Sequence, residues 1–319
     1  MKKFLVAVSL ACASGLAVAA DVWPAKAVHV IVPFPPGSSP DLVARMLTDK
    51  LAQALRQPVI VENKPGAGGN IGTGLVAKAD PDGYTLGLSI PGPLAVNTVL
   101  YKKMEYDPFT ELAPITLVAM SPNVLIVNPS LGVNSVKEFV EYVKARPGKL
   151  NYGSIGNGSA SHLTMELLKM QAGVDLVHVP YPGSPQVNTA ILANQIQAGF
   201  VVPGTAMPMV QSGRVKALAV TSSTKSPVLP DLPTVAEAYP GFESSAWIGM
   251  VAPAKTPKPI IDRLNQELVA IIHSPDVREK MLRIYFQAIG TPPEGLVSLM
   301  RSERDRWAKV IKQSGASAD

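Results

Sequence analysis

The stretch VHVIVPFPPGSSPDLVARMLTDKLAQALRQPVIV, residues 28–61, decides the fold of this chain. It opens with an apolar run at 28–32 and closes with another at 58–61, and both runs are typical of buried β-strands. Between them, apolar residues recur at helical spacing from about Asp41 to Leu55, and Asp41 is a good N-cap for that helix. A strand, a helix and a second strand form a βαβ unit, so the stretch predicts a parallel sheet.

The same alternation of strands and helices continues along the chain. Further strands are predicted at residues 85–89, 123–127, 150–154, 176–179, 198–202 and 215–221. Further helices are predicted at residues 135–145, 159–171, 185–193, 257–273, 276–287 and 293–311. We therefore expect an α/β protein of two lobes, one built from residues 21–122 and 245–319 and the other from residues 123–244.

Residues 1–20 differ in composition from the rest of the chain. They begin with Lys2 and Lys3, continue with apolar and small residues, and end in small residues before Asp21, a pattern typical of a secretory signal peptide. The apolar run is too short for a membrane-spanning helix. Because Cys12 is the only cysteine, cleavage just before Asp21, or one residue earlier, leaves a secreted chain without disulfides or thiolate metal sites.

Charge and motif patterns argue against several function classes. The 319 residues carry a net charge of +5, but the basic residues are scattered rather than gathered into a block, which argues against nucleic-acid binding. The four histidines have no metal-ligand spacing, so neither a metal nor a cofactor is predicted. Residues 72–77 match a G-x-G-x-x-A pattern, but no strand directly precedes them and no acidic residue follows about twenty positions later, so a dinucleotide site is rejected.

Two loops, at residues 33–41 and 152–162, share one design. Each follows a predicted strand, leads into a predicted helix and is rich in Gly and Ser. In an open α/β sheet such loops lie at the carboxyl ends of the strands, where ligands bind. A helix start has unpaired amide groups and partial positive charge, so it suits a carboxylate or phosphate without help from Arg or Lys. Together the loops predict an anion site between the lobes, although each alone also fits an ordinary strand-to-helix connection.

The mature sequence contains several distinctive blocks, among them Pro33-Phe34-x-Pro36-Gly37 with Asp41 and Arg45, residues 61–72, residues 81–86, and His178-Val179-Pro180-Tyr181. Together they resemble the solute-binding receptors of tripartite tricarboxylate transporters, also called the Bug family. The resemblance implies a type II-like periplasmic binding fold, with two parallel or mixed sheets flanked by helices and a ligand cleft between the lobes. It also implies a monomeric receptor rather than an enzyme, which passes a small-molecule carboxylate to the two membrane subunits of a transporter.

The resemblance further implies which residues contact the ligand. In the family the two loops hold one carboxylate, partly through ordered water, which carries over to Pro36, Gly37, Ser38, Ser39, Ser154, Gly156, Asn157, Gly158 and Ser159. Another candidate is His162, on the first turn of the helix that follows the second loop. Candidates in the rest of the site are Ser89, Asn123, Tyr181, Gly183, Val202, Pro203 and Gly204. Ser38 stands where the family usually has a second glycine, so its side chain either narrows the pocket or supplies a hydroxyl group.

These candidates include no cluster of Lys or Arg, so we expect a mono- or dicarboxylate with an apolar body rather than a tricarboxylate. An aromatic dicarboxylate such as terephthalate fits this description. Two alternatives stay open. One is a secreted α/β hydrolase that uses Ser159 as nucleophile and His162 as base. The other is a ligand-sensing receptor without a transport role.

Overall fold

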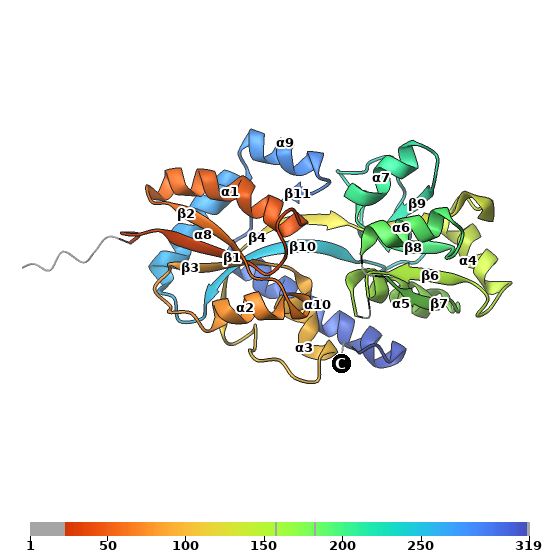
Figure 1. The fold of residues 1–319 in the computed structure, drawn as a ribbon, viewed down its shortest axis with the longest axis horizontal. Coiled ribbons are helices and arrows are strands. Elements are labelled where there is room, and N and C mark those ends of the chain that lie inside the picture. The colour runs from red at the N-terminus through yellow and green to blue at the C-terminus, as the bar shows by residue number, and fades with distance from the viewer. Residues whose placement is uncertain (1–22, 157, 182, 318–319) are drawn as a thin grey trace, which may run out of the picture.

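The computed structural model describes residues 23–156, 158–181 and 183–317, which form two lobes along the long axis of the molecule (Figure 1). The predicted signal peptide therefore lies outside the described residues. One lobe is built on a six-stranded sheet with the order β11-β4-β10-β3-β1-β2, and the other on a five-stranded sheet with the order β7-β6-β8-β5-β9. The expectation of a two-lobed α/β fold is confirmed.

The sheet of the first lobe combines a parallel half and an antiparallel half. Its strands are β1 (Val28–Val32), β2 (Val59–Asn63), β3 (Thr85–Ser89), β4 (Leu112–Pro122), β10 (Ser245–Pro253) and β11 (Gln287–Ala288). β1 pairs in parallel with β2 and β3, whereas β10 runs antiparallel to β3 and β4. Successive side chains of a strand point to opposite faces, so Val30 and Ile31 belong to the cores on the two sides of the sheet.

Helices cover both faces of this sheet. On one face lie α1 (Ser39–Leu55), α8 (Lys258–Ile272) and α9 (Pro275–Arg283). On the other lie α2 (Asn70–Ala77) and the first half of α10 (Pro293–Ser314), with the short helix α3 (Asn97–Leu100) beside α10. The G-x-G-x-x-A stretch lies inside α2, where a Cβ on Gly72 would come within 2.6 Å of the carbonyl oxygen of Lys64. That glycine therefore serves close packing.

The second lobe repeats the layered arrangement on a smaller sheet. Its strands are β5 (Val124–Val127), β6 (Asn151–Ser154), β7 (Val177–Pro180), β8 (Ala198–Val201) and β9 (Lys216–Val220). β6 pairs in parallel with β7 and β8, and β5 runs antiparallel to β8 and β9. One face is covered by α4 (Val136–Lys144) and α5 (Ala160–Ala172), and the other by α6 (Ser184–Leu192) and α7 (Pro203–Gln211).

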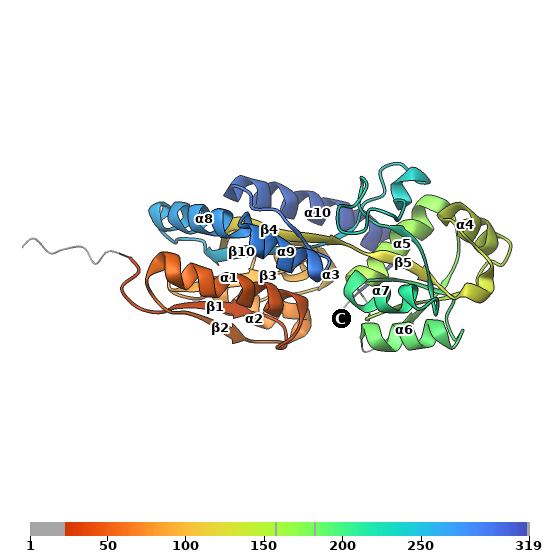
Figure 2. The same cartoon turned by 90° about the horizontal axis from the view of Figure 1, so that it is seen from above.

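Three connections join the lobes. The chain passes from β4 directly into β5 and returns through residues 221–244 to β10. Figure 2 shows the long strand β4 running toward the second lobe. The third connection is α10, whose residues Trp307, Val310 and Ile311 pack into the core of the second lobe, and Figure 1 shows this end of the helix below α5. The last helix therefore contacts both lobes, although the sequence predicts that it belongs to the first.

The structure differs from the predicted elements in several respects. First, the sequence pattern does not predict β4, β10, α2, α3 or α7. The prediction that Asp41 is the N-cap of the first helix is wrong, because α1 begins at Ser39 with Ser38 as its N-cap. Second, the helix predicted over 276–287 is wrong in its last residues, because α9 ends at Arg283. Tyr285 adopts a left-handed backbone with φ of 61°, which ends the helix, and Gln287 pairs with Met120 of β4. Strand pairing with a distant segment thus overrides the local helical pattern.

Candidate functional site

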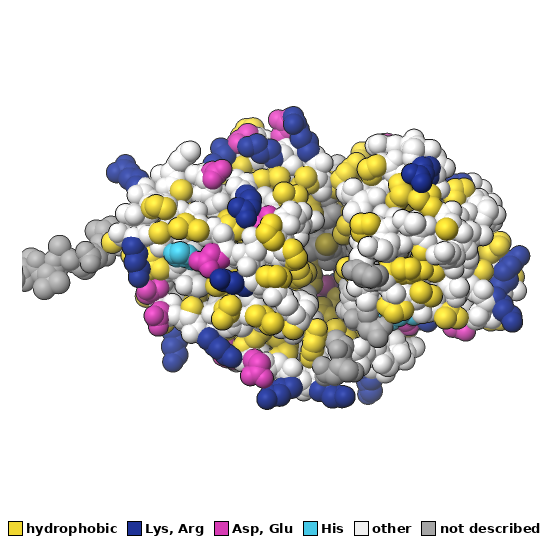
Figure 3. Space-filling view, in the orientation of Figure 1, with side chains coloured by type: hydrophobic (Ala, Val, Ile, Leu, Met, Phe, Trp, Pro, Cys, Tyr) yellow, Lys and Arg dark blue, Asp and Glu magenta, His cyan; other side chains and the backbone are white. Residues whose placement is uncertain are grey.

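A cleft of about 400 Å³ lies between the lobes, and both lobes contribute to its wall. Five residues that line it are aromatic: Phe34, Tyr101, Phe200, Trp247 and Phe286. Within the described parts of the chain, no acidic, basic or histidine residue lines it. Figure 3 shows hydrophobic side chains on both sides of the hollow between the lobes, with Lys and Arg mostly on the outer surface. The cleft therefore suits a ligand with an apolar body.

At the first loop, the start of α1 is occupied by a side chain of the protein itself. Oδ2 of Asp41 accepts a hydrogen bond from the amide of Gly37 at 2.8 Å, and Oδ1 accepts one from Nδ2 of Asn63 at 2.9 Å. Arg45, one helical turn further on, forms an ion pair with the same carboxylate. Burial alone would raise the pKa of Asp41, but hydrogen bonds from Arg45, Gly37 and Asn63 hold that pKa below its usual value. Asp41 is therefore ionised, and it fixes the loop.

The first loop offers the cleft one helical amide fewer than the second. Ser39 and Pro40 line the cleft at this helix start; the amide of Ser39 makes no hydrogen bond to any described residue, and Pro40 has no amide hydrogen. The hydroxyl oxygen of Ser38 is buried and has no hydrogen-bond partner among the described residues.

The second loop is held together by hydrogen bonds behind the cleft. Ser159 is the N-cap of α5, where its Oγ accepts from the amide of His162 at 3.3 Å and donates to the carbonyl oxygen of Gly156 at 2.7 Å. Nδ1 of His162 accepts from the amide of Gly158 at 2.9 Å. These bonds satisfy the polar groups of the loop without using the first amides of the helix.

The first two amides of α5 remain free. The amide groups of Ala160 and Ser161 make no hydrogen bond to any described residue, as expected for the first turn of a helix. Both residues line the cleft, together with Gly158 and Ser159 before them. The start of α5 therefore presents two donors and the positive end of the helix dipole to the cleft.

Two stacked histidines support the second loop from behind. The ring centroids of His162 and His178 lie 4.0 Å apart, and Tyr152 stacks against both rings. Nε2 of His178 lies 2.5 Å from Oγ of Ser154. Burial lowers the pKa of both histidines, and repulsion from His162 helps to lower that of His178 to about 4. Both rings are therefore neutral at pH 7 and position the loop.

Ser159 and His162 do not form a nucleophile and base. In such a pair the imidazole accepts the proton of the hydroxyl group. Here Nδ1 of His162 faces the amide of Gly158, and the hydroxyl of Ser159 bonds to the carbonyl oxygen of Gly156. The arrangement is that of a helix cap.

The structure divides the predicted site residues into three groups. Those that line the cleft are Ser39, Asn123, Gly158, Ser159 and Val202. Those buried behind it are Ser89, Ser154 and His162. Those on the same loops and helix starts that do not line it are Pro36, Gly37, Ser38, Gly156, Tyr181, Gly183, Pro203 and Gly204. Asn157 lies outside the described residues.

Sequence reasoning missed most of the apolar wall. Trp247 and Ile248 belong to β10, which the sequence pattern does not predict, and Phe286 follows the misplaced end of α9. Their only signal in the sequence is hydrophobicity, which they share with core residues such as Leu88. No local pattern could therefore have assigned them to a site.

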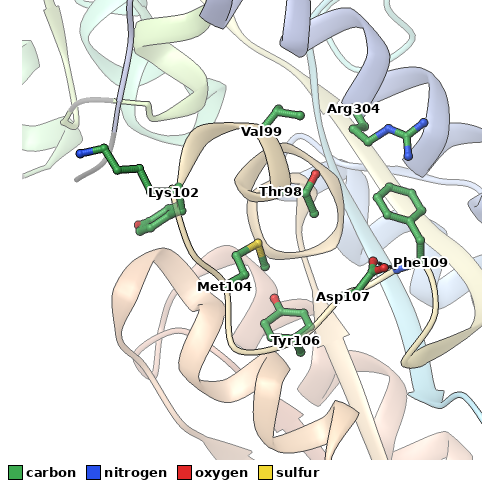
Figure 4. Close-up of a pocket in the computed structure, with 9 residues that line it drawn as sticks. Thr98, Val99, Lys102, Met104, Tyr106, Asp107, Phe109 and Arg304 are labelled. Carbon is green, nitrogen blue, oxygen red and sulfur yellow. Dashed lines mark hydrogen bonds between the residues drawn. The ribbon is translucent and has the colours of Figure 1, made fainter.

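A second pocket, of about 340 Å³, lies outside the cleft beside α3 and the segment that follows it (Figure 4). There the guanidinium carbon of Arg304 lies 4.8 Å from the ring centroid of Phe109. The wall of this pocket comes from residues 98–109 and α10, whereas the interlobe cleft is lined by both lobes and by a helix start. We therefore place the candidate site in the interlobe cleft.

None of the helices in the described residues combines the length and apolar character needed to span a lipid bilayer. In the same parts of the chain, no group of three or more His, Cys, Asp or Glu side chains could hold a metal ion.

Comparison with known proteins places the chain in a family. Residues 43–316 match the tripartite tricarboxylate transporter family receptor. Protein BugT of Bordetella pertussis is 36% identical over 301 residues, which cover 94% of this chain and 92% of BugT. The structure of Rpa4515 from R. palustris with adipate has a TM-score of 0.81 and 35% identity, and it covers 92% of this chain and 99% of that one.

A second receptor structure agrees with this assignment. MatC (Rpa3494) from Rhodopseudomonas palustris with bound malate has a TM-score of 0.76 and 33% identity, and it covers 91% of this chain and 100% of that one. The chain therefore belongs to the tripartite tricarboxylate transporter receptor family, and it is a solute-binding receptor rather than an enzyme.

Proposed function

We propose that this receptor captures a small organic mono- or dicarboxylate with an apolar body in the periplasm and delivers it to the membrane subunits of a tripartite transporter. The observation that carries the proposal is the start of α5, where the free amides of Ala160 and Ser161 adjoin a cleft that no charged side chain of the described residues lines. A carboxylate bound there would receive hydrogen bonds and the partial positive charge of the helix. A tricarboxylate would lack compensating charges.

The aromatic wall supports a ligand whose body is aliphatic or aromatic. Phe34, Trp247 and Phe286 contribute from the first lobe, and Phe200 contributes from the second. Rpa4515 was solved with adipate, which has a purely aliphatic body, and MatC with malate, which carries a hydroxyl group. An apolar wall favours the adipate type, and the aromatic side chains make terephthalate a further candidate.

The proposal also includes export of the chain to the periplasm and closure of the two lobes around the ligand. The signal peptide at residues 1–20 would direct the chain to the periplasm, where the receptor would act as a monomer. Because the ligand would contact both lobes, they would close around it.

A thermal-shift screen of aliphatic and aromatic mono-, di- and tricarboxylates tests the ligand class. A ligand at a hundred times its dissociation constant should stabilise the receptor by about 2.7 kcal/mol. The proposal fails if no mono- or dicarboxylate raises the Tm, or if tricarboxylates alone do so.

The substitution Ala160→Pro tests whether the free amides at the start of α5 bind the carboxylate. Ala160 is the first residue of α5, where proline fits a helix, and Ser159 before it has the extended backbone (ψ 158°) that a following proline requires. The substitution removes one amide hydrogen from the cleft and keeps the helix. We expect carboxylate affinity to fall by about tenfold to a hundredfold, because a hydrogen bond to a charged group contributes about 1.5–3 kcal/mol. Calorimetric titration measures this change.

Lys258→Pro is the matched control. Lys258 is the exposed first residue of α8, and no described residue of that helix lines the cleft. The control should fold and bind with unchanged affinity. If a folded Ala160→Pro variant also kept its full affinity, the carboxylate would not bind at the start of α5.

A further inference from the structure

We infer that Asn123 binds a second polar group at the far end of the ligand and thereby makes the receptor select dicarboxylates over the matching monocarboxylates. The inference rests on the proposed function, because it concerns the same cleft. Asn123 lines the cleft and is only 3% exposed, yet its side-chain nitrogen Nδ2 has no hydrogen-bond partner among the described residues. Buried polar groups nearly always have a partner, so this unpaired donor indicates that the ligand supplies the acceptor.

The main chain holds Asn123 in place. Its amide donates to Oγ1 of Thr221 at 2.8 Å, and its carbonyl oxygen accepts from the amide of Thr221 at 3.0 Å. Oγ1 of Thr221 donates in turn to the carbonyl oxygen of Ser244, whose Oγ lies 2.6 Å from Oγ1 of Thr164. This buried network fixes the backbone from which the side-chain amide of Asn123 projects.

The strand order separates Asn123 from the start of α5. Asn123 immediately precedes β5, whose residue Val124 pairs with Val201 of β8. β8 lies next to β6, and β6 leads into the loop before α5. Two strand spacings therefore separate β5 from β6, or about 10 Å. A ligand that reached from the α5 amides to Asn123 would cross Val201 and Val202, which line the cleft between them.

The first lobe has the same progression along its side of the cleft. Ser39 follows β1, Ile90 follows β3, and Trp247 lies in β10, and these strands are neighbours in the order β1-β3-β10. The polar lining residues of the first loop, such as Ser39, therefore lie at the β1 end together with Phe34, and the wall further along is apolar and aromatic. Asn123 introduces an unpaired donor into the apolar end.

A carboxylate is the ligand group that best matches this donor. It accepts hydrogen bonds without donating any, and a bond to a charged acceptor is stronger than one to a neutral acceptor. A monocarboxylate would place an apolar end against Asn123 and leave its Nδ2 buried and unpaired. Sites that hydrogen-bond one ligand group reject analogues without it for this reason.

Calorimetric titration of the full mature chain tests the inference with two matched ligand pairs: adipate with hexanoate, and terephthalate with 4-methylbenzoate. In the wild type, we expect the dicarboxylate of at least one pair to bind about tenfold more tightly than its partner, which corresponds to about 1.4 kcal/mol. Asn123→Leu replaces the amide with an apolar group of similar size. It should remove this preference mainly by weakening the dicarboxylate.

The Tm of the Asn123→Leu variant without ligand is a second test. It removes an unpaired buried donor, so its ligand-free Tm should equal or exceed that of the wild type. If it does not fold, Asn123→Asp keeps the shape and replaces the donor with an acceptor. That variant should weaken the dicarboxylate more than the monocarboxylate.

Asn97→Leu is the control within the same cleft. Asn97 also lines the cleft, but its Nδ2 already donates to Oδ1 of Asn70 at 2.6 Å. Its substitution should change both members of a pair equally. If the wild type does not distinguish the members of either pair, or the Asn123 variants weaken both equally, the inference is wrong while carboxylate capture stands. A wild type that binds neither these four acids nor any mono- or dicarboxylate of the thermal-shift screen would overturn the proposed function and the inference together.

Discussion

The loops that precede α1 and α5 share the same hydrogen-bond arrangement, but the side chain that accepts the bond is charged in one and neutral in the other. In each, a glycine with positive φ, Gly37 or Gly158, donates its amide to the side chain at the third helical position, four residues later. That side chain is the carboxylate of Asp41 in α1 and the neutral imidazole of His162 in α5. Asp41 places negative charge at its helix start, whereas His162 adds none. Similar Gly- and Ser-rich loops thus carry a charged anchor at the helix start in one lobe and an uncharged helix start beside the cleft in the other.

Removing the anchor should produce the largest change in stability. Asp41→Ala would leave the backbone amide of Gly37 without its acceptor, and it would remove one of two acceptors of Nδ2 of Asn63 and the ion pair of Arg45. We expect the free energy of unfolding to fall by about 2 kcal/mol, as measured by urea denaturation. Asp262→Ala, which breaks an exposed ion pair with Lys258, should cost much less. Equal losses in the two variants would mean that Asp41 does not anchor the loop.

The second loop should respond to acid through His178. Because folding lowers the pKa of His178 to about 4, the unfolded chain binds more protons below the ordinary histidine value. Stability should therefore fall by about 1–2 kcal/mol as the pH drops from about 6.5 toward 4, after allowance for the partial exposure of the ring. His178→Gln should flatten this part of the profile, as measured by unfolding at a series of pH values. A profile with an unchanged slope would show that the stacked pair does not titrate as described.

The smallest effect concerns Ser38 in the first loop. Its buried hydroxyl has no partner among the described residues, so Ser38→Ala should keep or raise the free energy of unfolding, by at most about 1 kcal/mol. Titration of the same variant with the ligand found in the screen shows whether the hydroxyl binds it. Lower affinity with unimpaired stability would assign Ser38 to the site, and a clear loss of stability would reveal a partner within the protein.

Local patterns predicted the parts of the fold that local interactions determine. β1 and β3 have the predicted bounds, because β1 is a short, mostly apolar run and β3 alternates Leu86 and Leu88 with Thr, Gly and Ser. The central strands β4 and β10 were missed, since they are stabilised by pairing with each other across more than a hundred residues of sequence. The end of α9 was wrong for a similar reason, because β4 draws Gln287 into the sheet. Pairing between segments that are distant in sequence does not produce a periodic pattern of apolar residues around the paired residue.

The sequence by itself determined the alternation of strands and helices, the two Gly- and Ser-rich loops and the resemblance to a receptor family, because each depends on residues close together in the chain. The tertiary structure alone brought Trp247, Phe286 and Asn123 to one cleft, and it alone left Nδ2 of Asn123 without a partner among the described residues. A free amide or an unpaired side chain is defined by every group that could reach it. Those groups come from strands and helices far apart in sequence, so only their packing decides what remains for a ligand.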